Sequence, residues 1–206
     1  MLDEAVAALR EGKVVAAATE TFFGLLADID DPRALDAVFA FKGRGGEKAS
    51  ALLLPNVEAW AELVVAIPPV AARLAQAFWP GPLTIVLPAK AGLDPRLVLD
   101  GRVGVRLPAA SAAADLVRAY GKPLTATSAN RTGEPPIVDA SEVERVFAGE
   151  VRAGELVVLP GRAPGGAPST IVAVEEGALR VVREGAIPKA TLEAALATPP
   201  AENPPR

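Results

Sequence analysis

Short runs of apolar residues, separated by polar turns, set the pattern of this chain. Runs of this length, bounded by Gly, Pro and charged residues, predict buried β-strands. The predicted strands are VVAAA (14–18), ALLLP (51–55), LTIVLPA (83–89), VGVRLP (103–108), PLTATSA (123–129), LVVLP (156–160), STIVAV (169–174) and LRVVR (179–183). The last two are expected to form a hairpin through residues 175–177, and TETFFG (19–24) is predicted to be a turn.

Apolar residues at helical spacing, with capping residues at the ends, predict helices between these strands. The expected helices span residues 2–11 before Gly12, Pro32 to Lys42 behind an Asp cap, Asn56 to Val65, 69–79, Ser111 to Tyr120, a short helix behind a Ser141–Glu144 capping box, and 189–197. This mixture of strands and helices predicts one α/β domain over residues 1–190, with a twisted, mixed sheet that is largely antiparallel and flanked by helices. Residues 191–206 are expected to hold the end of the last helix and a disordered, Pro-rich tail.

Composition narrows the chemistry that this domain can perform. The 206 residues include no Cys and no His, which excludes disulfides, thiolate sites and the Ser-His-Asp triad. Any reaction must therefore use Lys, Arg, Asp, Glu, hydroxyls, backbone amides or a magnesium ion. A formal charge of −4 argues against a broad nucleic-acid surface. No apolar run approaches the roughly 20 residues that span a bilayer, and the first residues do not resemble a signal peptide, so we expect a soluble, cytoplasmic protein without membrane contact.

Polar side chains recur where predicted strands and helices end. Such ends converge on ligand clefts in α/β sheets, although each residue also has a plain structural interpretation, as a turn former, helix cap or solvated charge. Arg106 is the hardest to explain in that way, because a cation flanked by Val103, Val105 and Leu107 needs a partner or a ligand anion. The candidate residues are Thr19, Thr21, Lys42, Arg44, Arg106, Ser128, Asn130, Ser169 and Arg183. Together they supply the cations and hydroxyls that hold a phosphorylated substrate and a small carboxylate.

In their order along the chain, these motifs resemble the YrdC-like threonylcarbamoyl-AMP synthase family, in its short, single-domain type. The resemblance covers about residues 5–190 and is carried by ATETFFGL (18–25), FKGR (41–44), WPGPLTIVL (79–87), VGVRLP (103–108), TATSAN with GEPP (125–136), PSTIV (168–172) and VVREGAI (181–187). These look like the family's PTETVYGL, KxR, PGPLT, VRxP, SAN-SG-P, PSTIV and REG elements. The resemblance implies a sheet with a concave, positively lined ligand cleft.

The resemblance also implies an activity: an ATP-dependent nucleotidyltransferase that condenses L-threonine, bicarbonate and ATP to threonylcarbamoyl-adenylate and pyrophosphate, with Mg²⁺ accompanying ATP. The family's catalytic and nucleotide-binding quartet corresponds to Lys42, Arg44, Ser128 and Asn130. Arg183 corresponds to an arginine near the nucleotide, and Arg106, Ser169 and one of Thr19 or Thr21 to positions that help to hold threonine or nucleotide. No metal ligand in the protein itself is implied. The expected partners are downstream proteins that transfer the threonylcarbamoyl group to tRNA, with possible tRNA contact.

Three departures from the family pattern keep other functions open. Ala18 and Phe23 replace a Pro and a Tyr, and GGEKASALLLP (45–55) replaces a Pro-rich stretch after the KxR element. A paralogue of the same fold with a different or lost acid substrate is therefore an alternative. A tRNA or double-stranded RNA-binding module is another, which the net acidity disfavours. A carbamoyl-phosphate domain of larger maturation proteins is a third.

Overall fold

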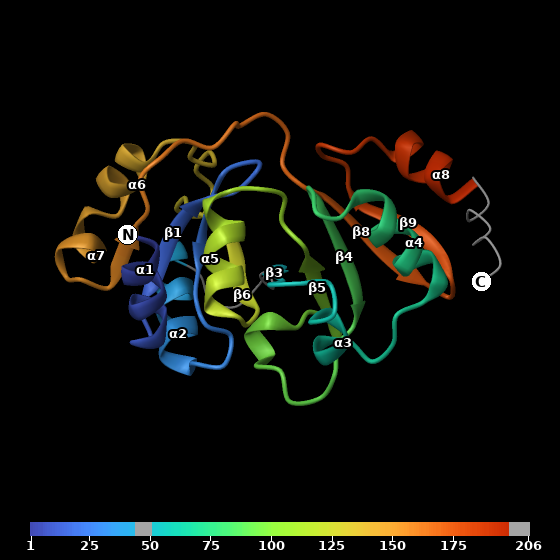
Figure 1. The fold of residues 1–206 in the computed structure, drawn as a ribbon, viewed down its shortest axis with the longest axis horizontal. Coiled ribbons are helices and arrows are strands. Elements are labelled where there is room, and N and C mark those ends of the chain that lie inside the picture. The colour runs from blue at the N-terminus through green and yellow to red at the C-terminus, as the bar shows by residue number, and fades with distance from the viewer. Residues whose placement is uncertain (44–50, 198–206) are drawn as a thin grey trace, which may run out of the picture.

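A computed structural model describes residues 1–43 and 51–197 of the chain. Over these residues, nine strands form one sheet in the order β7-β1-β2-β6-β3-β5-β4-β8-β9 (Figure 1). Only the β1–β7, β3–β5 and β4–β8 pairs of this described sheet are parallel, and the other pairs are antiparallel. The strands are β1 Val14–Ala18, β2 Phe23–Leu26, β3 Ala51–Leu53, β4 Leu83–Pro88, β5 Arg102–Arg106, β6 Leu124–Ser128, β7 Leu156–Val158, β8 Thr170–Glu175 and β9 Ala178–Arg183. The α/β fold with a mixed, largely antiparallel sheet is confirmed.

The helices lie between the strands, and two of them begin at the caps that the sequence predicts. They are α1 Leu2–Arg10, α2 Pro32–Lys42, α3 Trp60–Leu63, α4 Pro69–Phe78, the 3₁₀ helix η1 Pro95–Leu97, α5 Ala112–Tyr120, α6 Ala140–Val146, α7 Ala148–Arg152 and α8 Lys189–Ala197. The side chains of Asp31 and Ser111 accept the first free N–H groups of α2 and α5. Gly43 and Gly121 end these two helices in the left-handed conformation, which glycine adopts without steric cost. No helix of the described residues is both long and apolar enough to cross a membrane.

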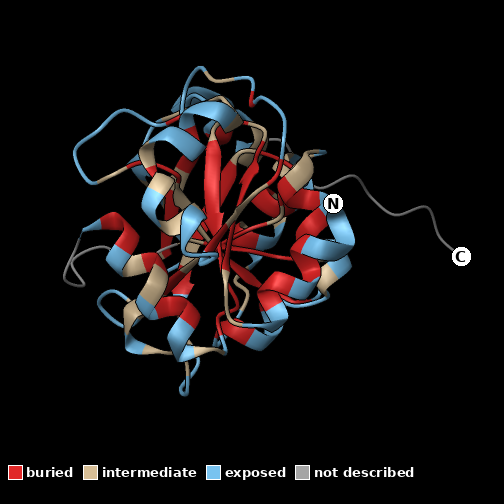
Figure 2. Cartoon of the chain, turned by 90° about the vertical axis from the view of Figure 1, so that its left-hand side faces the viewer, coloured by how far each residue is buried: buried red, intermediate tan, exposed pale blue. Residues whose placement is uncertain are grey.

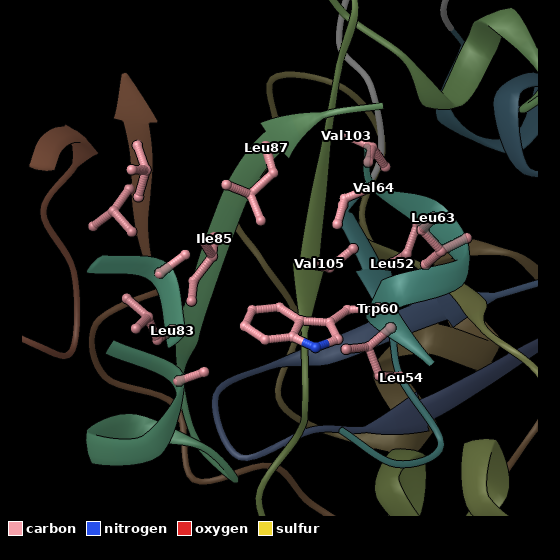
Figure 3. Close-up of a cluster of buried hydrophobic side chains, with 14 of the residues drawn as sticks. Leu52, Leu54, Trp60, Leu63, Val64, Leu83, Ile85, Leu87, Val103 and Val105 are labelled. Carbon is pink, nitrogen blue, oxygen red and sulfur yellow. The ribbon is translucent and has the colours of Figure 1, made fainter. Parts of the chain in front are cut away.

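Apolar side chains pack the helices against the sheet in three clusters. Helices α1, α2, α6 and α7 gather around the β7-β1-β2 end, whereas α3, α4 and α8 gather around the β4-β8-β9 end (Figure 1). Most strands are buried, and most exposed positions lie on the outer faces of the helices and in the loops (Figure 2). Strand β9, at one edge of the described sheet, is largely exposed. In the largest cluster, Trp60 lies among Leu52, Leu54, Ile85 and Val105 (Figure 3).

Strand β6 joins the two halves of the sheet. Residues 124–126 pair with β3, while residues 127–128 pair with β2. The buried hydroxyl of Thr125 lies between β6 and β2, where it accepts the N–H of Ala27 at 3.0 Å and donates to the carbonyl of Leu25 at 3.1 Å. Thr125 is thus a structural residue, and it explains one of the hydroxyls in the polar segment after Pro123.

Three local predictions were wrong. The sequence TETFFG is a turn only to Phe22, because Phe23 begins strand β2 opposite Ala18. The helix expected from Asn56 to Val65 is reduced to α3, although Asn56 does accept the N–H of Ala59. Helix α6 begins after Asp139, whose carboxylate accepts the Ser141 N–H, so no Ser141–Glu144 capping box forms.

Candidate functional site

One cavity of about 470 Å³ is lined by side chains from strands at the centre and the β8–β9 end of the sheet, and from the loops around them. The cavity-lining residues are Thr19, Thr21, Phe22, Phe23, Gly24, Lys42, Ala51, Thr84, Arg106, Ala126, Thr127, Ser128, Asn130, Pro136, Pro168, Ser169, Ile171 and Arg183. Along β4, β5 and β8, lining residues alternate with core residues: Thr84 and Ile85, Arg106 and Val105, Ile171 and Val172. Successive side chains of a strand point to opposite faces of the sheet. On these three strands, one face therefore packs into the core and the other lines the cavity.

Small residues at the centre of the sheet leave the space for a ligand. Gly24 lies opposite Ser128 in the β2–β6 pair, and Ala51 lies opposite Ala126 in the β3–β6 pair. Gly24 has no side chain, and Ala51 and Ala126 carry only a methyl group, so little side-chain volume fills the middle of the cavity. The cations and hydroxyls lie around this space, an arrangement that is typical of ligand clefts.

The Lys42 ammonium group is buried at one edge of the cavity. Its Nζ donates to the carbonyl of Ser128 at 2.7 Å, to the carbonyl of Asn130 at 2.6 Å and to the Asn130 side-chain oxygen at 2.9 Å. The Ser128 hydroxyl also donates to that side-chain oxygen. Lys42, Ser128 and Asn130 thus form one network, in which the lysine brings a positive charge to the cavity and fixes the orientation of the other two side chains.

Two side chains of the 131–132 turn hold the end of helix α2, and with it Lys42. Arg131 donates to the carbonyl of Phe41 at 2.6 Å and pairs with Glu150 at 2.6 Å. The Thr132 hydroxyl donates to the carbonyl of Lys42 at 2.6 Å. These carbonyls have no partner within the helix, so the turn caps the C-terminus of α2 and fixes its last side chain.

Arg106 finds its partner in Glu20, which our sequence analysis did not single out. Nε of Arg106 donates to Oε1 of Glu20 at 3.1 Å, and Nη2 lies 2.5 Å from the same oxygen. Oε1 also accepts the N–H of Ala109 at 3.3 Å. Arg106 Nη2 and Glu20 Oε2 are both buried and neither is in hydrogen-bonding geometry with any described group. The sequence shows an acidic residue between Thr19 and Thr21, but no local pattern predicts that it pairs with Arg106.

At the β8–β9 end of the cavity, Arg183 donates from Nη2 to the Ser169 carbonyl at 2.7 Å and lies 3.2 Å from its hydroxyl. Burial, followed by the charge of Arg106, lowers the pKa of the Arg183 guanidinium from its usual value. The two arginines therefore repel each other across this edge. An anion bound between them would relieve that repulsion.

The buried Thr170 hydroxyl connects the PSTIV and REG motifs. It donates to the carbonyl of Ile187 at 2.7 Å and accepts the N–H groups of Gly185 and Ile187 at 3.0 and 2.9 Å. Gly185 itself passes so close to the Pro168 carbonyl that an added Cβ would lie 2.1 Å from that oxygen. The two motifs are therefore parts of one packed unit that carries Ser169 and Arg183.

Thr19 and Thr21 lie side by side at the β1–β2 turn. The Thr19 hydroxyl accepts the N–H groups of Thr21 and Phe22 at 3.1 and 3.2 Å, so Thr19 organises the turn. The Thr21 hydroxyl contacts only Thr19 within the described part of the chain, at 3.1 Å. The GRAPGG segment (161–166) is held against this turn by a hydrogen bond from Gly165 N–H to the Thr21 carbonyl at 2.8 Å.

The structure places nearly all of the candidate residues around one cavity. Thr19, Thr21, Lys42, Arg106, Ser128, Asn130, Ser169 and Arg183 all line it. Arg44 and the GGEKAS segment lie outside the described residues. The residues that sequence reasoning missed are Glu20 and Arg131, which hold Arg106 and helix α2, and Thr84.

The chain is similar in sequence to a protein family and to several named proteins. The Sua5_yciO_yrdC family model, described as "Telomere recombination", matches residues 7–185. The threonylcarbamoyl-AMP synthase of Pyrococcus abyssi is 36% identical over 187 residues, which cover 90% of this chain and 54% of that protein. The threonylcarbamoyl-AMP synthase of Methylobacillus flagellatus is 37% identical over 175 residues, covering 83% of this chain and 93% of that protein.

A solved structure is also similar over most of the chain. The P. abyssi Sua5 protein complexed with L-threonine superposes with a TM-score of 0.87 at 33% identity, covering 95% of this chain and 57% of that one. The chain thus spans little more than half the length of the P. abyssi relative. The extent of the family match and the identity to these relatives show that the chain belongs to the Sua5/YciO/YrdC family.

Proposed function

We propose that this chain is a threonylcarbamoyl-AMP synthase, which converts L-threonine, bicarbonate and ATP to threonylcarbamoyl-adenylate, pyrophosphate and water. One observation carries the proposal: Lys42, Arg106 and Arg183, from distant parts of the sequence, line one cavity together with Ser128, Asn130 and Ser169. Relatives of that name at 36% and 37% identity support it. So does the L-threonine in the P. abyssi Sua5 structure.

The proposed reaction needs no histidine. The threonine amine first combines with bicarbonate to give a carbamate and water. A carbamate oxygen then attacks the α-phosphorus of ATP, and the bond to the bridging oxygen breaks as pyrophosphate leaves. The protein must align two anions and stabilise the charge that develops on the leaving group, which fixed cations and hydrogen-bond donors can do.

Each polar edge of the cavity suits one part of this task. We assign Lys42 and Arg44, with Ser128 and Asn130, to the phosphate and carbamate oxygens, and Arg183 to the nucleotide. The Lys42 ammonium already donates to three oxygens, so its main contribution is its charge and the orientation of Ser128 and Asn130. Arg106 is assigned to the threonine carboxylate, with Ser169 and one of Thr19 or Thr21 orienting the substrates.

Mg²⁺ is proposed to enter with ATP. Among the described residues, no group of three or more His, Cys, Asp or Glu side chains could hold a metal ion. Mg²⁺ often keeps several waters and binds through substrate phosphates, so it fits here as part of the nucleotide. When bound, it would neutralise phosphate charge. Downstream proteins that transfer the threonylcarbamoyl group to tRNA, and a cytoplasmic location, complete the proposal.

The deciding experiment measures pyrophosphate release from ATP and Mg²⁺, with threonine and bicarbonate each omitted in turn and serine tested as a substitute. Release that requires both co-substrates is the expected result. If ATP binds while threonine neither binds nor supports release, the changed GGEKAS segment has altered the acceptor, and the paralogue with another acid substrate replaces this proposal. Salt-dependent tRNA binding without ATP turnover would point instead to an RNA-binding module.

A further inference from the structure

The hydroxyl of Thr84, on strand β4, has no hydrogen-bond partner among the described residues. The residue is 2% exposed and lines the cavity. Its hydroxyl takes part in none of the side-chain hydrogen bonds of the described residues. These bonds do include the hydroxyls of the two fully buried threonines, Thr125 and Thr170. The Thr84 oxygen is not among the fully buried unpaired side-chain atoms of the described residues, so it keeps contact with the cavity. A ligand that displaces solvent from this hydroxyl must replace the lost hydrogen bond or leave the hydroxyl unpaired at a cost in free energy, so the ligand is its expected partner.

The position of Thr84 in the sheet identifies its neighbours. Ile85 and Val105 pair in the core, so Thr84 and Arg106 come next to each other on the opposite, cavity-lining face. The Thr84 methyl group lies toward Gly104, where an added Cβ would come within 3.1 Å of it. The hydroxyl is the other branch of the side chain, and it is therefore directed away from Gly104.

The groups beside Thr84 favour an anion as its partner. The buried Nη2 of Arg106 contacts Glu20 Oε1 but is not in hydrogen-bonding geometry with any described group, and Glu20 neutralises only one positive charge at this edge. Arg183, whose pKa the Arg106 charge helps to lower, supplies the second cation. A carboxylate can accept from two or more donors at once, which neither an ammonium group nor an aliphatic side chain can do.

We propose that the Thr84 hydroxyl donates to the carboxylate of the amino-acid substrate, next to Arg106, and so helps to select and position that substrate. This inference rests on the proposed function, because it assigns a new contact within the same site. It makes Thr84 a binding residue whose hydroxyl contributes to substrate affinity and nothing to the stability of the free protein.

The test uses Thr84→Val, which keeps the shape of the side chain and removes the hydroxyl, and Thr84→Ser, which restores it. We expect Thr84→Val to weaken L-threonine binding by about 10- to 100-fold, as measured by calorimetry and by KM, because a hydrogen bond to a charged group is lost. The KM for ATP and the thermal midpoint should match those of the parent, and Thr84→Ser should recover most of the affinity. Thr170→Val is the matched control: it removes a hydroxyl with three protein partners and should lower the thermal midpoint.

Competition with L-2-aminobutyrate, which has the carboxylate but no side-chain hydroxyl, locates the contact. Thr84→Val should weaken both amino acids by the same factor. A loss confined to threonine would mean that Thr84 contacts the substrate side chain, and would overturn the carboxylate assignment. Unchanged threonine affinity, or a thermal midpoint lowered as in Thr170→Val, would also overturn it. If the parent protein binds no threonine, both this inference and the proposed substrate fail. If the parent and Thr84→Val both turn over threonine with the same KM, only this inference fails.

Discussion

The carboxylate of Glu20 lies against the guanidinium of Arg106, with Nη2 and Oε1 2.5 Å apart, and links the β1–β2 turn to the end of strand β5. The two side chains are only 12% and 7% exposed. Substrate would therefore meet an Arg106 that Glu20 already orients and pairs. The pair thus joins two segments whose paired residues are 86 positions apart in sequence.

Replacing Glu20 by Gln should destabilise the protein strongly. The substitution keeps the shape of the side chain but leaves the Arg106 charge buried without its counter-ion, which typically costs about 3 kcal/mol in the free energy of unfolding. Denaturant unfolding measures this loss. Glu4→Gln is the control, because Glu4 pairs with the N-terminus at the surface, where the side chain is 80% exposed, and should change nothing measurable. Equal effects of the two variants would show that solvent screens the Glu20–Arg106 pair.

Removing the Lys42 ammonium should abolish most of the proposed activity. We expect Lys42→Ala to lower the rate of threonine-dependent pyrophosphate release by about 10²- to 10³-fold, corresponding to roughly 3 to 4 kcal/mol of transition-state stabilisation. Rates are compared at a temperature where unfolding curves show each variant to be folded, because the carbonyls of Ser128 and Asn130 also lose a donor. Lys189→Ala, which removes an exposed lysine on α8, should retain the parent rate. An unchanged rate in Lys42→Ala would refute the assignment.

The sequence predicted the elements of this fold better than the contacts between them. Strand β1 and helix α5 have the predicted bounds, because a buried apolar run or a Ser cap followed by a Gly stop is a local signal. Strand β2 was missed because FGLL is short and follows a turn motif. The order of the strands, with β6 divided between β2 and β3, depends on contacts far apart in sequence.

The candidate site shows the same division. Sequence reasoning found the polar residues at strand ends, and the described ones line one cavity. It could not separate Thr125, which bonds to the β2 backbone, from Ser128, three residues later, which joins the Lys42 network. It also missed Glu20 and Thr84. The role of Glu20 depends on a partner that is distant in sequence, and the role of Thr84 depends on having no hydrogen-bond partner among the described residues. A local sequence pattern predicts neither.

A methyl group at position 185 should disturb the edge of the site that carries Ser169 and Arg183. In Gly185→Ala the new Cβ would lie 2.1 Å from the Pro168 carbonyl oxygen, so the backbone must shift, at a typical cost of about 1–3 kcal/mol. We expect a lower thermal midpoint and a higher KM for a substrate. Gly149→Ala is the control, since nothing lies within 4 Å of a Cβ added there and alanine suits a helix better than glycine. If both variants behaved alike, the backbone around Gly185 would accommodate the added methyl group more easily than its packing indicates.

The ionisation of Tyr120 should report on the packing of α5 against the sheet. The Tyr120 hydroxyl donates to Asp28 Oδ2 at 2.5 Å. Burial first, and then this hydrogen bond and the Asp28 charge, raise the pKa of the Tyr120 hydroxyl above its ordinary value of 10.0. Above pH 10 the unfolded chain therefore loses this proton while the folded protein keeps it, so the free energy of unfolding should fall as the pH rises beyond that point.

The chain has a single tyrosine, so the ultraviolet absorbance of tyrosinate reports Tyr120 alone. In the folded protein tyrosinate should appear only well above pH 10, whereas in concentrated guanidinium it should appear near the ordinary value. Asp28→Asn should bring the folded titration closer to the unfolded one, because it removes the negative charge beside the hydroxyl. Tryptophan fluorescence checks that the protein is still folded at each pH. Tyrosinate forming near pH 10 in the folded parent would mean that the Tyr120–Asp28 contact is open to solvent.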